Sequence, residues 1–234
     1  MYALVLAGGR GERLRPLTDD LPKPMVPLHE RPILWHQARW LTAAGVTDIV
    51  FLAGYRWEAI RRYFGDGAEF GFRAHYSIEE TPLGRGGAIR MGMERVPATE
   101  TEVVVTNGDV VTKEDLRSIH RHFLERRRSA PDHQATIMVV PFVSPYGVVE
   151  MDGKGAVTGF GEKAEMPYWI NGGVYVLSRD IEGALPELGD HEDTTFPSLA
   201  ARGRLTAFKS RAFWRSIDSF KDLREAEEVM GGGG

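Results

Sequence analysis

The alternation of short apolar runs with helix-like runs is the feature that most constrains how this chain can fold. Apolar runs typical of buried strands occupy residues 2–6, 48–53, 72–78 and 102–106. Helix-like runs begin near residue 32, at residue 57 and near residue 88, so each lies between two of these strands. This alternation predicts βαβ units and an α/β fold with a mostly parallel sheet flanked by helices. Sheets of this kind bind ligands beyond the carboxyl ends of their strands.

The pattern changes after residue 131, where strand-like runs follow one another without long helices between them. These runs occupy residues 135–141, 146–152, 156–163, 170–177 and 205–210, and residues 220–230 form a closing helix-like run. The segment at 152–155, Asp-Gly-Lys-Gly, is typical of a β-hairpin turn. We therefore expect a mixed sheet in one domain over residues 1–230, whose second half inserts a partly antiparallel portion. The glycines at 231–234 read as a flexible tail.

Composition narrows the classes of protein that remain. A length of 234 residues suits one domain with a substantial core. The formal net charge of −4 disfavours a nucleic-acid partner, because such binding usually requires a clustered basic excess. The absence of cysteine excludes disulfides and thiolate metal sites. The apolar run at the start is too short to span a bilayer and has no basic leader, so we expect a cytoplasmic protein with no membrane partner.

A glycine loop follows the first strand-like run, where residues 6–17 read LAGGRGERLRPL. Its three glycines, Gly8, Gly9 and Gly11, would let backbone amides approach a polyphosphate closely. A turn with solvated arginines is the simpler interpretation. The run KPMVP begins at Lys23, close behind the loop, and its added positive charge argues for a phosphate site instead.

Two better-known phosphate loops do not fit this segment. A Walker loop needs Gly-Lys followed by Ser or Thr, and the chain contains no such triplet. A dinucleotide-binding loop needs a further glycine where Leu14 stands. It also needs an acidic residue after the second strand, where the chain has Gly54 and Tyr55.

The run from residue 6 to residue 27 resembles the signature of the sugar nucleotidyltransferases, the family that makes activated sugars such as GDP-mannose. This resemblance implies a Rossmann-like, glycosyltransferase-A-like fold. Residues 1–130 would bind the nucleotide, and residues 131–230 would bind the sugar phosphate. It further implies that Arg13 polarises the triphosphate and that Lys23 bridges the phosphates of both substrates. The residues of this run implied to bind the nucleotide are Leu6, Ala7, Gly8, Gly9 and Gly11.

Two aspartates resemble the metal ligands of the family. Asp109 follows the apolar run at 102–106, and the simpler alternative is that it caps a following helix. Asp218 follows a strand-like run near the C-terminus, although Ser-Phe replaces the turn that is usual in the family. Asp222 competes with it but falls within the expected closing helix. The resemblance implies that Asp109 and Asp218 bind Mg²⁺, which needs few protein carboxylates.

The segment at 79–88 resembles the family's base-recognition loop. A carboxylate at Glu79 could accept hydrogen bonds from both N1–H and the N2 amine of guanine, a pair of donors that uracil and thymine lack. This favours GTP; the alternative is that Glu79 is solvated and the backbone reads the base. Arg85 stands where relatives often have threonine, so this loop departs from the family in detail. The other residues implied to bind the nucleotide are Pro82, Gly84 and Asn107.

Three short motifs in the second half resemble the family's sugar site, and they read YGVVE at 146–150, FGEK at 160–163 and NGGVY at 171–175. The resemblance implies that Gly147 approaches the hexose ring and that Glu162 accepts hydrogen bonds from its hydroxyls. Lys163 would pair with the sugar phosphate, and Asn171 would complete the site. A single Glu-Lys pair carries little weight, because surface ion pairs are common. The ordered series of three motifs is what supports the resemblance to a sugar site.

Three segments, at residues 63–67 (YFGDG), 76–83 and 170–174, look most like bacterial GTP-dependent enzymes acting on manno-configured sugars, the heptose-1-phosphate and mannose-1-phosphate guanylyltransferases. We therefore expect an enzyme that transfers a nucleoside monophosphate from an NTP to a sugar 1-phosphate. Mg²⁺ would be its cofactor, the two small molecules its partners, and a homodimer is one assembly open to it. A UTP- or dTTP-dependent glucose-1-phosphate nucleotidyltransferase is the alternative among enzymes. A catalytically inactive regulatory paralogue is the alternative outside them.

Overall fold

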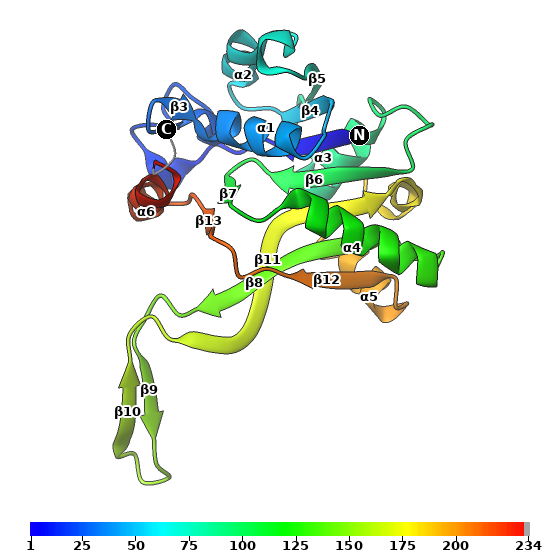
Figure 1. Ribbon diagram of the computed structural model, residues 1–234. Helices are drawn as coiled ribbons and strands as arrows, with labels where there is room; N and C mark the ends of the chain where they lie inside the picture. The colour runs from blue at the N-terminus through cyan, green and yellow to red at the C-terminus, as the bar shows by residue number, and fades with distance from the viewer. Residues whose placement is uncertain (232–234) are drawn as a thin grey trace.

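A seven-stranded mixed sheet forms the centre of the computed structural model, which describes residues 1–231 (Figure 1). Its strands in spatial order are β12 (Leu205–Lys209), β8 (Ala135–Val143), β11 (Glu165–Ser178), β6 (Glu102–Asn107), β1 (Tyr2–Leu6), β4 (Asp48–Ala53) and β5 (Arg73–Ile78). Strands β6, β1, β4 and β5 pair in parallel, as do β12 and β8. The long strand β11 is antiparallel to both of its neighbours. The sheet is therefore mostly parallel, and the predicted α/β class is confirmed.

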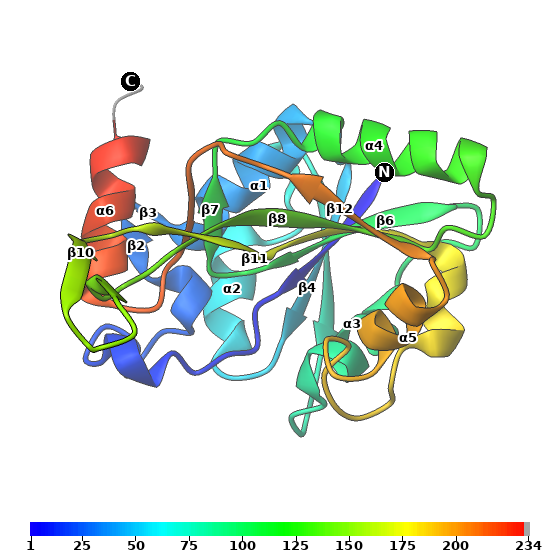
Figure 2. The ribbon, with the colours of Figure 1, turned by 90° about the horizontal axis from the view of Figure 1, so that it is seen from below.

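Helices cover both faces of this sheet. The α-helices of the described residues are α1 (Ile33–Ala43), α2 (Trp57–Phe64), α3 (Gly84–Met93), α4 (Leu116–Ser129), α5 (Thr195–Ala201) and α6 (Phe220–Met230), and α1 to α5 lie on the sheet. The short 3₁₀ turns are η1 (Glu12–Leu14), η2 (Lys23–Met25), η3 (Ala68–Phe70) and η4 (Arg179–Ala184). One hydrophobic cluster joins α1, α2 and α4 to one face of the sheet, including Ala3 and Phe51. A second joins α3 and α5 to the other face, including Leu4 and Leu52. Figure 2 shows α1 and α4 on one side of the sheet and α3 and α5 on the other.

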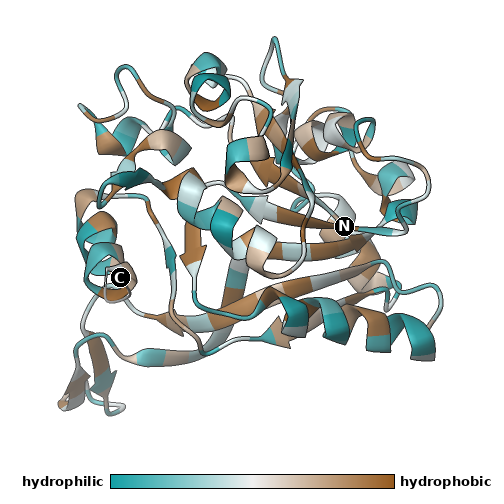
Figure 3. Cartoon of the chain, turned by 45° about the horizontal axis from the view of Figure 1, so that its top comes forward, coloured by the Kyte–Doolittle hydropathy of each residue, from teal (hydrophilic) through white to brown (hydrophobic). Residues whose placement is uncertain are grey.

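The sequence explains this layering. All six residues of β4 are buried, as expected of a strand covered on both faces. Helix α4 buries Leu116, Ile119 and Phe123, whose spacing puts them on one face, and Asp115 caps its first turn. Figure 3 shows the result, with hydrophobic strands inside and hydrophilic residues on the outer face of α4.

A third, smaller hydrophobic cluster holds the C-terminal segment against the body. It packs Leu223 of α6 and Ile217 against Leu28 and Val111. The short strands concerned are β2 (Pro27–Leu28), β3 (Arg31–Pro32), β7 (Val110–Thr112) and β13 (Trp214–Ser216). Strand β13 pairs antiparallel with β7. This pairing brings the residues after β13 beside the turn that joins β6 to β7.

A two-stranded hairpin, β9 (Val148–Met151) and β10 (Val157–Gly161), projects from the body at the lower left of Figure 1. Its apolar side chains are open to solvent: Met151, Val157 and Phe160 are each about two-thirds exposed. The hairpin therefore contributes little to the core.

Most predicted elements are present, and a few were missed. Strands at 2–6 and 48–53 and helices at 57–64 and 220–230 have the predicted bounds. Elements α4, α5 and β7 were not predicted from the sequence. Helix α6 ends at Met230 with Gly231 as its C-cap, and the rest of the expected glycine tail, 232–234, lies outside the described residues. No helix in the described part of the chain is both long enough and apolar enough to cross a bilayer.

Candidate functional site

The carboxyl ends of β1 and β6 bring the glycine loop and Asp109 together. These neighbouring strands pair in parallel, with Leu6 opposite Asn107. The amide of Gly108 donates to the carbonyl of Leu6 at 2.8 Å. Asp109 lies between β6 and β7, so it does not cap a helix, and that alternative is excluded. Both motifs therefore lie at the edge of the sheet where ligands bind.

A lysine lies between two carboxylates at this edge. Nζ of Lys23 donates to Oδ2 of Asp109 at 2.6 Å and to Oδ1 of Asp218 at 2.7 Å. The guanidinium of Arg13 donates to the same Asp218 oxygen at 2.7 Å. These four side chains, which we call the charged cluster, were all singled out from the sequence. The fold brings them together although Lys23 and Asp218 are 195 positions apart.

Local contacts distinguish Asp218 from Asp222. Burial alone would raise the pKa of Asp218, but hydrogen bonds from Lys23 and Ser216 and the lysine charge outweigh burial and hold that pKa below its ordinary value. The Asp222 carboxylate instead accepts hydrogen bonds from the Asp218 amide at 3.2 Å and the Ser219 hydroxyl at 2.7 Å. Asp222 therefore belongs to the N-terminal cap of α6, while Asp218 contacts Lys23.

Close packing accounts for two glycines of the loop. Gly11 has a left-handed φ of 66°, and a Cβ atom there would lie 2.7 Å from Cβ of Lys23. A Cβ atom at Gly8 would lie 2.6 Å from Oε1 of Glu79. Larger residues at these two positions would push the loop away from Lys23 and from Glu79.

A cleft of about 330 Å³ opens beside the charged cluster. The expected site residues that line it are Leu6, Gly8, Gly9, Glu79, Pro82, Gly84, Asn107 and Asp109. A second hollow, of about 380 Å³, is lined by Arg10, Gly11, Glu12, Arg13, Lys23 and Asp218. Asp109 lines the cleft, and Lys23, which it contacts, lines the hollow. Ala7 is fully buried beneath the loop and lines neither space.

Glu79 follows β5 and reaches into the cleft. Its Oε2 accepts a hydrogen bond from the backbone amide of Leu83 at 3.0 Å. Its Oε1 lies against Gly8 and Gly54. The carboxylate is therefore held in place, and it can accept hydrogen bonds from a ligand edge that carries two donors.

Two acidic residues that were not predicted from the sequence, Asp190 and Glu192, belong to this region. Arg85 pairs with Asp190 at 2.7 Å and with Glu192 at 2.6 Å, and both Arg85 and Asp190 line the cleft. Glu192 accepts a hydrogen bond from the side chain of Asn171 at 2.7 Å. Asn171 is thus connected to the cleft through two side chains. The only signal in the sequence was a cluster of acids in the segment GDHED at 189–193.

The other three expected sugar residues lie at the base of the hairpin β9–β10. A Cβ atom at Gly147 would lie 3.1 Å from Oε1 of Glu162, so these two residues are neighbours. Lys163 follows with a left-handed φ of 51°. Among the residues that the structure describes, these three are absent from the lining of both the cleft and the hollow. The structure therefore groups them without bringing them to the charged cluster.

The two cluster carboxylates fit a magnesium ion. Oδ1 of Asp109 is buried and has no hydrogen-bond partner within residues 1–231. Its Oδ2 and an oxygen of Asp218 already face one cation, the ammonium of Lys23. Within the same residues, no group of three or more His, Cys, Asp or Glu side chains is placed to hold a metal. Two carboxylates match an ion that takes its other ligands from phosphates and water.

A mostly parallel sheet with a glycine loop, a cleft and a charged cluster at its ligand edge defines an α/β protein suited to nucleotides. The chain matches the family model described as Nucleotidyl transferase over residues 2–231, and it belongs to that family. This confirms the resemblance seen in residues 6–27. The chain is 33% identical to a mannose-1-phosphate guanyltransferase from Pichia angusta over 95% of its own length. It spans 62% of that relative.

Solved structures show the same fold. A Bacillus anthracis protein in complex with sucrose superposes with a TM-score of 0.80 at 22% identity, covering 100% of this chain and 96% of that one. HddC from Yersinia pseudotuberculosis, complexed with GMP-PN, superposes with a TM-score of 0.73 at 26% identity, covering 98% and 99%. The fold class and the family are thus supported independently of the site geometry.

Proposed function

We propose that the chain catalyses transfer of the guanylyl group of GTP to mannose 1-phosphate, giving GDP-mannose and pyrophosphate. The observation that carries this proposal is the charged cluster at the ligand edge of the sheet, beside a cleft that contains Glu79. An inactive regulatory paralogue would have no need of an intact cluster. Family membership supports the reaction class, and the similarity to a mannose-1-phosphate guanyltransferase supports the substrates.

The chemistry needs positioning and charge neutralisation more than acid–base groups. An ionised oxygen of the sugar phosphate attacks the α-phosphorus of GTP, forming a new P–O bond. The bond from the α-phosphorus to the oxygen that bridges to the β-phosphate breaks, and pyrophosphate leaves with that electron pair. Arg13 and Lys23 would neutralise the crowded phosphates and hold them in line. Asp109 and Asp218 would hold Mg²⁺, which when bound neutralises further phosphate charge.

The guanine preference depends on Glu79. Its carboxylate is held by Leu83 at the edge of the cleft, where it can accept hydrogen bonds from N1–H and the N2 amine together. The solved HddC complex contains a guanine nucleotide analogue, which supports the same base. A UTP- or dTTP-dependent enzyme acting on glucose 1-phosphate remains the second candidate.

The sugar phosphate would bind on the side of the cleft that contains Asp190 and Arg85. Asn171 reaches this side through Glu192. Roles for Gly147, Glu162 and Lys163 require the base of the hairpin to approach the cleft. Mannose is favoured over a manno-configured heptose by the similar relative. A homodimer and a cytoplasmic location stay predictions.

A pyrophosphate-release screen tests the proposal directly. GTP, ITP, ATP, UTP and dTTP are each combined with mannose, heptose and glucose 1-phosphates in the presence of Mg²⁺. GTP with mannose 1-phosphate should give the highest kcat/KM. GTP should exceed ITP by roughly ten- to a hundredfold, because inosine lacks the N2 amine and loses a hydrogen bond to a charged group worth ~1.5–3 kcal/mol. Glu79→Gln should narrow that gap.

Each result points to a separate part of the proposal. A higher kcat/KM with UTP or dTTP would overturn the guanine assignment and leave the reaction class standing. Equal use of GTP and ITP would show that Glu79 does not read the base. No pyrophosphate release with any pair would contradict the proposed reaction.

A further inference from the structure

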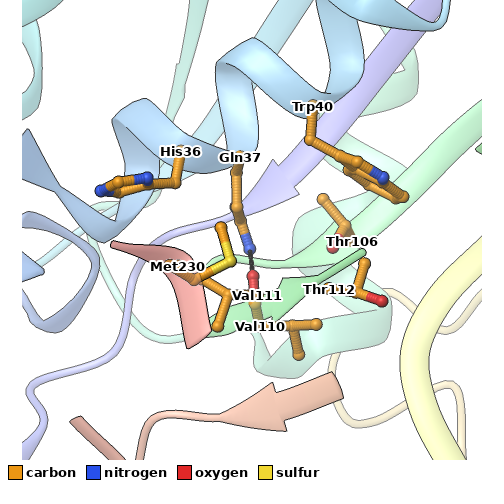
Figure 4. Close-up of a pocket in the computed structure, with 8 residues that line it drawn as sticks. All are labelled: His36, Gln37, Trp40, Thr106, Val110, Val111, Thr112 and Met230. Atoms are coloured by element: carbon orange, nitrogen blue, oxygen red, sulfur yellow. Dashed lines mark hydrogen bonds between the residues drawn. The ribbon is translucent and has the colours of Figure 1, made fainter. Parts of the chain in front are cut away.

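Gln37 is a buried polar residue of α1 that points at the backbone on either side of Asp109. Its side chain is only 3% exposed. Nε2 of Gln37 donates to the carbonyls of Asn107 and Val110, both at 2.6 Å. Figure 4 shows the side chain extending from α1 to the backbone at Val110, with His36 and Trp40 on the same helix.

The chemistry of these contacts fixes which end of the amide faces the turn. Both partners are carbonyl oxygens, which only accept, so the NH₂ group of Gln37 must face them. The other end of the amide, Oε1, is buried and has no hydrogen-bond partner within the described residues. A buried oxygen left unpaired is unfavourable. An apolar residue at position 37 would leave no buried oxygen unpaired. The two hydrogen bonds that Gln37 donates to Asn107 and Val110 are therefore the favourable contribution of this side chain.

The turn is also held from two other directions. The amide of Gly108 donates to the carbonyl of Leu6, at the start of the glycine loop. The amide of Ile217, next to Asp218, donates to the carbonyl of Asp109 at 2.9 Å. Gln37 supplies a third contact, from the helix behind the turn. With all three in place, the backbone of Asp109 cannot shift without breaking a bond to the glycine loop, to the segment of Asp218 or to α1.

We propose that Gln37 is a positioning residue for the metal site, holding the turn so that the Asp109 carboxylate faces Lys23 and Asp218. This inference rests on the proposed function, because it assumes that Asp109 and Asp218 bind the divalent ion. Gln37 contacts no substrate and acts only through the backbone of Asn107 and Val110. Groups that orient a metal ligand typically change metal affinity or activity by ~10–100-fold when they are removed.

Two variants of α1 separate positioning from stability. Gln37→Met keeps the length of the side chain but has no donor. Trp40→Phe is the matched control, because Trp40 lies one turn along the same helix and its Nε1 donates to the carbonyl of Glu114 at 2.7 Å, beyond β7. Each variant removes hydrogen bonds from α1 to backbone carbonyls, but only the first removes bonds to the turn of Asp109. Gln37→Asn is a second test variant: it remains polar but is too short to reach both carbonyls.

Electron paramagnetic resonance measures Mn²⁺ binding at the metal site. With GTP present and sugar phosphate omitted, the affinity is measured without turnover. We expect Gln37→Met and Gln37→Asn to weaken Mn²⁺ binding at least ~10-fold. Their KM for GTP at saturating Mg²⁺ should change less than about threefold while kcat falls. Trp40→Phe should lower the urea midpoint of unfolding but leave Mn²⁺ binding within about twofold of wild type.

The outcomes distinguish this inference from the proposed function. If wild type binds Mn²⁺ and the folded Gln37 variants bind it equally well, Gln37 does not position the site. An equal loss of Mn²⁺ affinity in Trp40→Phe would show a general effect of loosening α1 and would also overturn the inference. If the wild-type chain binds no Mn²⁺ beside GTP, the metal assignment itself fails, and this inference fails with it.

Discussion

Replacing Lys23 with methionine should separate two effects of its ammonium group. One is competition with a metal ion for Asp109 and Asp218, and the other is stabilisation of phosphate charge. The substitution keeps most of the apolar part of the side chain and removes the cation that Asp109 and Asp218 share. Because both carboxylate oxygens contact Nζ, at 2.6 and 2.7 Å, they lie no more than about 5 Å apart. The Lys23 side chain is only 12% exposed, so solvent screens this arrangement incompletely.

Coulomb's law gives the size of the effect. Two like charges about 5 Å apart repel by about 3 kcal/mol at an effective dielectric constant of about 20. Arg13 stays in contact with Asp218, but its side chain is 76% exposed, so it offsets only part of this repulsion. A net repulsion of about 1.4–3 kcal/mol remains. A divalent ion that no longer competes with the lysine would gain that energy, which corresponds to binding about 10- to 100-fold tighter.

Two measurements on Lys23→Met should therefore move in opposite directions. Mn²⁺ binding without nucleotide should become about 10- to 100-fold tighter. The kcat for pyrophosphate release should fall at least ~100-fold, because a preorganised group that stabilises phosphate charge is lost. Arg15→Met is the matched control, since it removes a cation from the same segment whose ion pair, with Asp19, is exposed. It should leave both quantities within about twofold.

The expected change in Mn²⁺ binding and the expected fall in kcat can each be refuted. Unchanged or weaker Mn²⁺ binding in Lys23→Met would show that the lysine and the ion do not compete for Asp109 and Asp218. Near-normal pyrophosphate release in this variant would show that Lys23 takes no part in the reaction. A variant that merely misfolds loses both properties, so it cannot imitate the expected result.

Three further predictions test other parts of the chain. Asp109→Asn should lower kcat for pyrophosphate release at least ~100-fold. Asp222→Asn should keep most activity and lose about 1 kcal/mol of stability in urea unfolding, because it weakens a helix cap. Equal losses of activity would contradict the assignment of Asp109 to the metal site and Asp222 to the cap. Lys163→Ala should raise KM for the sugar phosphate far more than KM for GTP, and equal rises would place Lys163 outside the sugar site. Burial lowers the pKa of His191 to about 4, and that of His133 likewise. The unfolded chain, with His pKa values near 6.5, therefore binds protons first as the pH falls, and stability is complete above about pH 6.5 and is lost towards pH 4. Burial also lowers the pKa values of His36 and His122. His191→Leu should therefore remove part, but not all, of the stability lost between pH 7 and pH 5, as measured by urea unfolding, and an unchanged loss would exclude His191 as a source.

The parts of the site that depend on local pattern could be predicted from the sequence. Gly8 and Gly11 stand where a side chain would collide with Glu79 or Lys23, and such loops are visible as short glycine-rich runs. Asp109 was found because it closely follows an apolar run typical of a strand, and all six residues of that strand, β6, are buried or partly buried. These features need only a few neighbouring residues to be recognised.

Features that depend on long-range pairing could not be predicted in the same way. Strands β7 and β13 have three residues each, too few to show a period, yet their pairing brings Asp218 to the cluster. Asp190 reaches the cleft from an irregular loop, where no periodicity exists to place it. In the sequence, Gln37 is only a polar residue on the apolar face of α1, and nothing near it in the sequence shows its contact with the turn of Asp109. Helix α4 is different, because its apolar spacing and its cap were open to prediction.

The balance of charge around the second hollow, which Arg13 and Lys23 line, connects the metal to the nucleotide. Three cations line this hollow, Arg10, Arg13 and Lys23, as do the acids Glu12 and Asp218. With Asp109, which contacts Lys23, the formal charges sum to zero. The protein alone therefore offers little net attraction to a triphosphate, which is strongly negative. A divalent ion held by the two aspartates would make the site positive and free Lys23 to contact phosphates. We therefore expect GTP and metal to strengthen each other's binding by the same factor, as linkage requires. Calorimetric titration of GTP with and without Mg²⁺ would show this, and equal affinities would contradict it.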